Sequence, residues 1–311
     1  MFYYWVLFNL LALGMLVVDL RVIHRPGRVV RSREALGWSL VYVAVAGGFA
    51  VLLDFWLGRQ AALEFVTGYV VELSLSVDNL FVFLMIFKYF AVPEEQQHSV
   101  LFWGILGALV MRGIFIGAGV GLIHRFHWVL FVFAALLVYS GIRVCVMGQH
   151  QIDPGANPFV KTLHRYMPVT KQYQGEKFFL RNPEDHARLY ATPLVVVLLV
   201  IETTDVLFAI DSIPAVLAIT LNAFIVYSSN VLAILGLRSM YFAVSGLIKM
   251  FRFLHYGLAL VLILVGLKML FADYLDIPIS TTLAVVAGVL LISVVASVLY
   301  PPEEKVSDED S

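Results

Sequence analysis

Long apolar runs recur along the whole chain and are separated by short polar segments. A helix of about 20 mainly apolar residues is long enough to cross the hydrocarbon core of a bilayer. The pattern therefore predicts an all-α, polytopic membrane protein with about nine transmembrane helices. The expected spans cover residues 3–20, 37–57, 65–87, 99–121, 127–147, 192–217, 223–248, 255–273 and 279–299.

The composition is that of a membrane protein, with 61% hydrophobic residues, 14% charged residues and a mean hydropathy of +0.89. A soluble domain would carry about 25% charged residues. The net charge of −1 indicates no particular partner, so we expect membrane lipid around the helices and no nucleic acid. The lone Cys145 excludes an intrachain disulfide and a thiolate metal cluster. Residues 3–20 lack signal-peptide flanks and are expected to form a retained helix.

The connections between the spans are alternately rich and poor in Lys and Arg. Because cytoplasmic loops of membrane proteins are enriched in these residues, the bias predicts the orientation. We expect a multi-pass protein of a bacterial-type inner (plasma) membrane, with its N-terminus outside and its C-terminus in the cytoplasm. The rich connections hold Arg21, Arg25, Arg28, Arg31, Arg33, Lys88, Lys161, Arg165, Lys171, Lys177, Arg181, Arg188, Lys249 and Arg252, and the poor ones hold Arg59 and Arg125.

Three features of spans 3–5 recur in the same order in spans 6–8. The matches are Glu72-x5-Asp78 with Asp205-x5-Asp211, Leu106-Gly107 and Arg112 with Leu235-Gly236 and Arg238, and Gly141-Ile142-Arg143 with Gly266-Leu267-Lys268. Since the unit has an odd number of helices, the second copy would enter the membrane from the opposite side. Such an inverted repeat is typical of secondary transporters, whose substrate sites lie near the midplane where the copies meet.

This repeat divides the chain into five segments. They are an N-terminal two-helix segment (1–64), the first repeat (65–147), a cytoplasmic loop (148–191), the second repeat (192–273), and a last helix with an acidic tail (274–311). Prolines at 154, 158, 168 and 183 argue against one long helix in the loop. The loop is either a small ordered cap or a flexible connector, and it is the expected contact for any protein partner.

Five carboxylates lie inside the apolar spans. They are Glu72, Asp78, Glu202, Asp205 and Asp211. Because each costs about 2.5–3.5 kcal/mol at mid-bilayer, such acids are expected to face protein, water or a cation. Asn79 and Ser212 directly follow the second acid of each motif and would add oxygen ligands. Carboxylate, amide and hydroxyl oxygens suit hard or borderline cations such as Mn²⁺, Mg²⁺ and Ca²⁺.

Helix geometry restricts how these acids act together. Residues six apart lie roughly 120° apart around a helix and about 9 Å apart along it. Glu72 and Asp78 therefore cannot grip one ion from an unbroken helix: either the helix opens, or the acids serve two steps of one path. Arg112 and Arg238 are expected to be structural counter-ions, which leaves five acids and two arginines with a formal charge of −3. Asn230 is expected either to bond another helix or to bind cargo.

The motifs resemble those of the TerC family. The resemblance rests on Glu72-Leu-Ser-Leu-Ser-Val-Asp78-Asn79-Leu-Phe, Glu202-Thr-Thr-Asp205-Val-Leu-Phe-Ala-Ile-Asp211-Ser212-Ile-Pro214, and Ser229-Asn230-Val-Leu-Ala-Ile-Leu-Gly-Leu-Arg238. It implies a TerC/Alx-like integral membrane protein of the LysE transporter superfamily, whose members are linked to tellurite resistance and manganese export. The family's motif acids carry over to Glu72, Asp78, Glu202, Asp205 and Asp211.

We therefore expect a Mn²⁺ exporter, proton-coupled, with no enzymatic activity and no organic cofactor. Glu72, Asp78, Asp205 and Asp211 would form the ion site with Asn79 and Ser212, and Glu202 would be a ligand or the proton-coupling acid. Export of another cation or an amino acid, or a scaffold that delivers metal to other proteins, are the alternatives. An intramembrane aspartyl protease is disfavoured because Phe208-Ala-Ile, and not Gly-x-Gly, precedes Asp211.

Overall fold

The computed structural model describes residues 2–19, 32–147, 157–170, 172–181, 189–244, 253–272 and 274–299. All nine expected spans form helices. Their bounds are α1 Phe2–Val18, α2 Ser32–Leu57, α3 Arg59–Tyr89, α4 Glu94–Arg125, α5 Val129–Met147, α7 Pro193–Leu217, α8 Ala223–Val244, α9 Leu254–Leu270 and α10 Ile279–Leu299. Seven of these described helices are long and apolar enough to cross a membrane, while α1 and α9 are shorter apolar helices. The predicted helical, polytopic architecture is confirmed.

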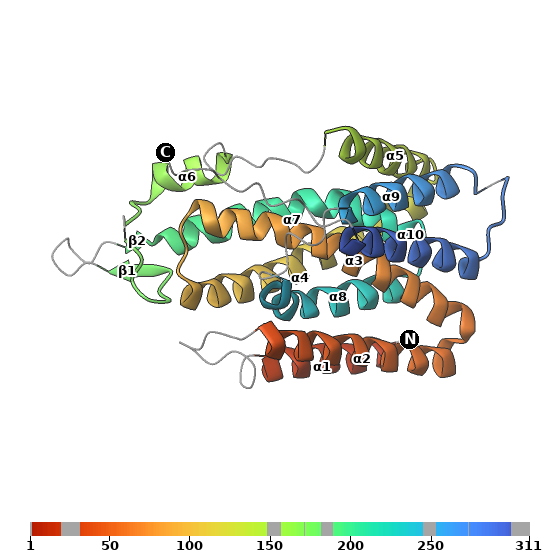
Figure 1. Cartoon of the computed structure of the whole chain (residues 1–311), viewed down its shortest axis with the longest axis horizontal. Helices are drawn as coiled ribbons and strands as arrows, with labels where there is room; N and C mark the ends of the chain where they lie inside the picture. Colours follow the sequence, from red (N-terminus) through yellow and green to blue (C-terminus); the bar gives the residue numbers. More distant parts are fainter. Residues whose placement is uncertain are drawn as a thin grey trace.

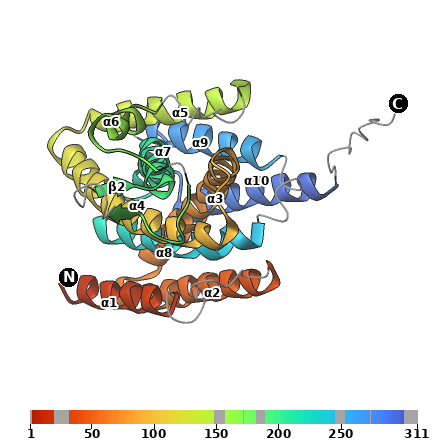
Figure 2. The same ribbon diagram turned by 90° about the vertical axis from the view of Figure 1, so that its left-hand side faces the viewer.

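The helices form a bundle in which α1 and α2 make an outer layer, and α5 lies on the opposite side (Figures 1 and 2). Between them, α3 packs on α8 and α7, and α4 packs on α7 and α8. Aromatic rings join the outer layer to the bundle, since Phe8 of α1 lies 5.2 Å from Phe49 of α2 and 5.9 Å from Phe224 of α8 between ring centroids. Helix α3 is thus surrounded by protein, which positions its acids inside the bundle.

Helices α2 and α3 are separated by a single residue. Gly58 has a φ of 89°, a left-handed value that glycine adopts without steric cost. The chain therefore turns sharply, and α3 begins at Arg59, six residues before the expected start of the third span. Span ends are the least reliable part of a sequence-based prediction, because capping and turn geometry set them.

Helix α5 packs most extensively on α9, and two glycines let these backbones approach. A Cβ atom on Gly141 would lie 2.6 Å from the carbonyl oxygen of Ala259, and one on Gly266 would lie 3.0 Å from the carbonyl oxygen of Ala134. The first distance is too short for a real side chain and the second is tighter than most real Cβ contacts, so the contact favours glycine on each helix. Gly141 and Gly266 are one of the two glycine pairs that the internal repeat matches.

The central segment is ordered where the structure describes it. Helix α6 (Pro158–Tyr166) begins at a proline and is capped by Asn157, whose side chain accepts from the amide of Phe159 at 2.9 Å. Strands β1 (Phe179–Arg181) and β2 (Leu189–Ala191) form a two-stranded antiparallel sheet, which an all-α prediction did not include. Of the two interpretations of this loop, its described parts fit the ordered cap.

The cap docks on the turn between α3 and α4. The hydroxyl of Tyr173 donates to the carbonyl oxygen of Phe90 at 2.7 Å, and Ser99 donates to Glu176 at 3.0 Å. Burial raises the pKa of Tyr173. These contacts tie the described part of the segment to the bundle, because both of its partners belong to the membrane helices or their turn.

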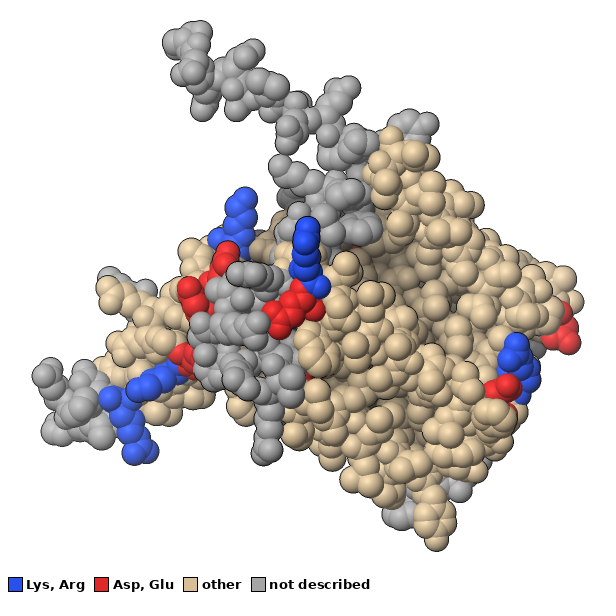
Figure 3. Space-filling model, turned by 60° about the horizontal axis from the view of Figure 1, so that its bottom comes forward, with Lys and Arg blue, Asp and Glu red and all other residues tan. Residues whose placement is uncertain are grey.

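Charged side chains seen in Figure 3 gather toward two ends of the molecule, and a broad face without Lys, Arg, Asp or Glu lies between them. Such an arrangement suits a protein surrounded by lipid. Part of the orientation argument lies outside the described residues. These positions are Arg21, Arg25, Arg28, Arg31, Lys171, Arg188, Lys249 and Arg252, together with the acidic tail from 303 to 311. The orientation, the five-segment division and the inverted relation of the repeat stay predictions.

Candidate functional site

The two acidic motifs lie on helices that are continuous through them. Helix α3 runs from Arg59 to Tyr89, and α7 runs from Pro193 to Leu217 with Pro214 inside it. Of the two geometries left open by the sequence, the unbroken helix is the one observed. Acids six residues apart are therefore held at different levels of the bundle, and they occupy two separate places.

The first acid of each motif binds Arg112. Its guanidinium on α4 makes an ion pair with Glu72 of α3, and it donates to both carboxylate oxygens of Asp205 at 3.3 and 3.4 Å. Arg112 is 1% exposed, Glu72 0% and Asp205 5%. A buried charge is tolerated when it is paired and hydrogen-bonded, and each of these three groups meets that condition. These ion pairs are those expected of a counter-ion to the motif acids.

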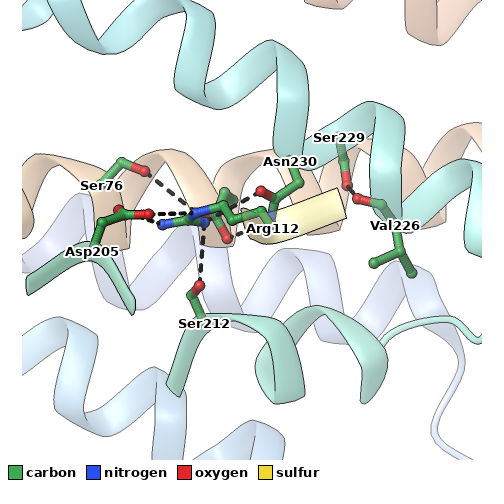
Figure 4. A network of polar contacts seen from close by, with 8 residues as sticks. Ser76, Arg112, Asp205, Ser212, Val226, Ser229 and Asn230 are labelled. Atoms are coloured by element: carbon green, nitrogen blue, oxygen red, sulfur yellow. Dashed lines mark hydrogen bonds and ion pairs between the residues drawn. The ribbon is translucent and has the colours of Figure 1, made fainter. Parts of the chain in front are cut away.

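Two neutral side chains complete this cluster, which we call the Arg112 network (Figure 4). Ser212 of α7 accepts from Arg112 Nη1 at 3.2 Å, and the side-chain oxygen of Asn230 accepts from the same nitrogen at 3.3 Å. Asn230 also donates to Glu72 at 2.9 Å. Asn230 of α8 therefore bonds other helices, as one of the two expectations for it proposed. The network joins four helices through a single guanidinium.

The second acid of each motif faces a cavity of about 440 Å³, which we call the Asp cavity. Asp78 of α3 and Asp211 of α7 both line it, and each is half-buried. Its other polar lining residues are Asn79, Tyr139, Ser140, Arg143 and Ser212. Apolar side chains from α3, α5, α7 and α9 form the rest of the wall. The cavity is large enough for water molecules or an ion beside the two carboxylates.

Helix α5 supplies a polar contact to the cavity that the sequence did not indicate. The Ser140 hydroxyl donates to Asp211 at 2.6 Å, a short distance typical of a hydrogen bond to a carboxylate. Ser140 is adjacent to Gly141, and the repeat pattern of Gly141-Ile142-Arg143 was the only sequence signal near it. A serine inside an apolar span is common, so its position became informative only once α5 was placed beside α7.

Glu202 of α7 lies beside Gly107 of α4. A Cβ atom built on Gly107 would lie 1.9 Å from one Glu202 carboxylate oxygen and 2.5 Å from the other. The carboxylate therefore rests against the backbone of α4 at a position where any side chain would displace it. Gly107 was noted in the sequence as part of the repeat, and the structure gives it this steric role.

Arg238 does not bind the motif acids. It makes an ion pair of 2.7 Å with Asp19, at the end of α1, and Tyr42 of α2 donates to the same carboxylate at 3.3 Å. Arg238 therefore pairs with an acid outside the five motif acids, with which the sequence argument had balanced its charge. Asp19 was missed because it lies at the end of the first span, where an acid is usually solvated.

The structure thus separates the seven predicted ligands into distinct places. Glu72, Asp205 and Ser212 lie in the Arg112 network, Asp78, Asn79 and Asp211 line the Asp cavity with Ser212, and Glu202 lies against Gly107. Within the described part of the chain, no three His, Cys, Asp or Glu side chains are close enough to hold one metal ion. The single four-acid site expected from the sequence is therefore not assembled in this conformation.

Comparisons with known proteins give one consistent result. Residues 57–305 match the model of the family described as "Integral membrane protein TerC family". A membrane protein of Myxococcus xanthus described as uncharacterized is 42% identical over 99% of this chain and 95% of its own length. A Salmonella typhi protein is 43% identical over 94% of this chain and 92% of its own, and is named "Putative membrane-bound redox modulator Alx". A protein of Escherichia coli K12 with that name is 42% identical over 93% and 92%. No solved structure matches the chain.

Proposed function

This chain belongs to the TerC family of integral membrane proteins, and from that premise we propose that it carries a divalent cation across the membrane. Mn²⁺ is the expected cargo. The observation that supports this most directly is the sorting of the motif acids. The two first acids, Glu72 and Asp205, are both paired with Arg112, while the two second acids, Asp78 and Asp211, face a cavity.

The Asp cavity has the chemistry of a cation site. Its polar wall supplies carboxylate oxygens from Asp78 and Asp211, an amide oxygen from Asn79 and hydroxyl oxygens from Ser140 and Ser212. These are ligands that hard divalent cations accept. Arg143 also lines the cavity, so two carboxylates and one guanidinium leave a formal charge of −1. A cation in this cavity would keep part of its hydration shell, because most of the wall is apolar and supplies no ligands.

Helix packing supports an alternating-access mechanism. In the repeat, α3 matches α7, α4 matches α8 and α5 matches α9. The cross pairs α3–α8 and α4–α7 both pack extensively, as does the matched pair α5–α9. A two-fold relation between the copies would produce this pattern. We propose that the two copies rock against each other around the acids. With the N-terminus outside, the cation would be exported and protons would move in the opposite direction.

The test is Mn²⁺ flux in liposomes that contain the purified full chain, with and without a pH gradient. We expect flux by the unchanged protein and a loss of at least tenfold in Asp211→Asn, which keeps shape and removes the charge. Glu64→Gln is the matched control, since Glu64 lies on α3 and accepts a hydrogen bond from Gln60 instead of facing the cavity. It should transport normally.

Two results would contradict the proposal. Folded protein that moves none of Mn²⁺, Mg²⁺ and Ca²⁺ under any gradient would argue for the scaffold alternative, particularly if a partner copurifies. Normal Mn²⁺ flux by Asp211→Asn would show that the cation does not pass through the Asp cavity. The redox name of the relatives is compatible with transport, because movement of a redox-active cation alters redox balance without a dithiol. This chain has one cysteine and forms no internal disulfide.

A further inference from the structure

Arg112 Nη1 occupies a point where oxygen atoms from three helices converge. Glu72 of α3, Ser212 of α7 and Asn230 of α8 all contact this one nitrogen, the last two at 3.2 and 3.3 Å. Asp205 binds the other two guanidinium nitrogens at 3.3 and 3.4 Å. Arg112 thus makes the usual two-contact pair with the Asp205 carboxylate. Its remaining nitrogen, Nη1, lies among three further oxygens, as a cation lies among its ligands.

The oxygens around this guanidinium are of the kinds that bind hard divalent cations. Two carboxylates, one amide oxygen and one hydroxyl oxygen form a set of four protein ligands. The set is buried, since Glu72, Asp205, Ser212 and Asn230 are each at most 5% exposed. Without a positive charge among them, two carboxylates would be buried uncompensated, which is strongly unfavourable. The guanidinium, a metal cation or protons on the carboxylates must therefore be present.

Ser212 connects this oxygen set with the Asp cavity. It lines the cavity and also accepts from Arg112 Nη1. The residue after Asp211 in the chain therefore belongs to both places. In the proposal below, a cation held by Asp78 and Asp211 moves past this hydroxyl to the oxygens that Arg112 occupies.

From this geometry we propose that Arg112 is a tethered competitor of the transported cation. The guanidinium and the cation occupy the same oxygen set in turn, and the cation enters from the Asp cavity as the arginine side chain withdraws. This inference rests on the proposed transport function and adds a mechanism to it. Arg112 stays paired with the buried carboxylates of Glu72 and Asp205 when no Mn²⁺ is bound, so the Mn²⁺-free protein can return between its two orientations.

The competition has a measurable consequence for binding. When only a fraction of the protein molecules is in the state that can bind a ligand, the apparent affinity for that ligand is reduced by the same fraction. If the arginine is withdrawn in about 1–10% of molecules, its removal should tighten binding by about 10- to 100-fold. Arg112→Met, which keeps an unbranched side chain and removes the charge, should therefore bind Mn²⁺ more tightly than the unchanged protein does.

The competition also separates two modes of transport. Net flux requires the Mn²⁺-free protein to reorient. Exchange of labelled for unlabelled Mn²⁺ requires only the Mn²⁺-bound protein to reorient. In Arg112→Met we expect net flux to fall at least tenfold and exchange to stay within about threefold of the unchanged protein. A structural role for Arg112 would lower both modes together.

The experiment measures Mn²⁺ binding to purified protein by calorimetry, and both transport modes in liposomes. Arg238→Met is the matched control, because Arg238 is the repeat-related buried arginine and binds Asp19 outside both clusters. It should change neither the Mn²⁺ affinity nor the ratio of exchange to net flux. Arg112→Lys preserves the charge in case Arg112→Met does not fold. The single ammonium of lysine cannot contact Glu72 and Asp205 together as the planar guanidinium does, so it should compete less with the cation. The Mn²⁺ affinity of Arg112→Lys should therefore rise, by a smaller factor than that of Arg112→Met.

The outcomes distinguish this inference from the proposed function. Mn²⁺ affinity that is unchanged or weaker in both Arg112 variants, with normal flux by the unchanged protein, would refute the competitor and leave transport standing. Equal loss of exchange and net flux in the folded variants would do the same. Absence of binding and flux in every form, including the unchanged protein, would refute the transport proposal and this inference with it.

Discussion

Replacement of Gly141 by alanine tests whether the α5–α9 contact positions the cavity. The added Cβ would lie 2.6 Å from the carbonyl oxygen of Ala259 and 2.6 Å from Cγ1 of Ile263. Ordinary contacts begin at 3.4 Å, so the two helices must separate locally by about 0.8 Å. Overpacking of this kind costs about 1–3 kcal/mol.

The displacement should fall mainly on α5. Helix α9 is held on other sides by α10 and α3, whereas α5 has smaller contacts with α7 and α4. Ser140, the neighbour of Gly141, would then move relative to Asp211, to which it donates at 2.6 Å. Loss of a hydrogen bond to a charged group costs about 1.5–3 kcal/mol, so flux should fall by about tenfold or more. We thus expect both a lower melting temperature and slower transport.

The assay combines thermal unfolding in detergent with Mn²⁺ flux normalised to folded protein. Gly288→Ala on α10 is the control, because a Cβ there meets nothing within 4 Å. Alanine is the better helix former by about 1 kcal/mol, so this control should be as stable as the unchanged protein or slightly more so. If Gly141→Ala matched Gly288→Ala in both measurements, the close α5–α9 approach and its link to Asp211 would be wrong.

Two further substitutions test the remaining acids. Asp19→Asn should lower the free energy of unfolding by about 3–5 kcal/mol, because it removes the carboxylate that Arg238 binds; unfolding in denaturing detergent measures this, and stability equal to that of the unchanged protein would contradict the buried pair. Gly107→Ala should push the Glu202 carboxylate away from α4 and change stability by less than about 1 kcal/mol, because the displaced atoms end a flexible side chain. If Glu202 couples protons, the pH-gradient dependence of flux should weaken in this variant, and an unaltered dependence would argue against that role.

The amino-acid sequence by itself determined the helices and the level of each acid. Apolar runs long enough to span a bilayer predict helices without reference to tertiary contacts, because backbone polar groups in lipid must be satisfied within the segment. All nine expected spans appear as helices. The spacing of Glu72 and Asp78 likewise excluded a shared ion on an unbroken helix, since 3.6 residues per turn places them on different faces. Local periodicity was sufficient for both conclusions.

Tertiary structure alone decided which groups meet. Arg112 and Arg238 occupy matched positions in the repeat, yet one binds Glu72 and Asp205 and the other binds Asp19. Nothing in the local sequence distinguishes them, because their partners lie on helices far apart in the chain. The same holds for Ser140 and Asp211, 71 residues apart, whose contact depends on where α5 lies beside α7. Partner choice follows from the packing of whole helices, and packing depends on which faces can approach closely.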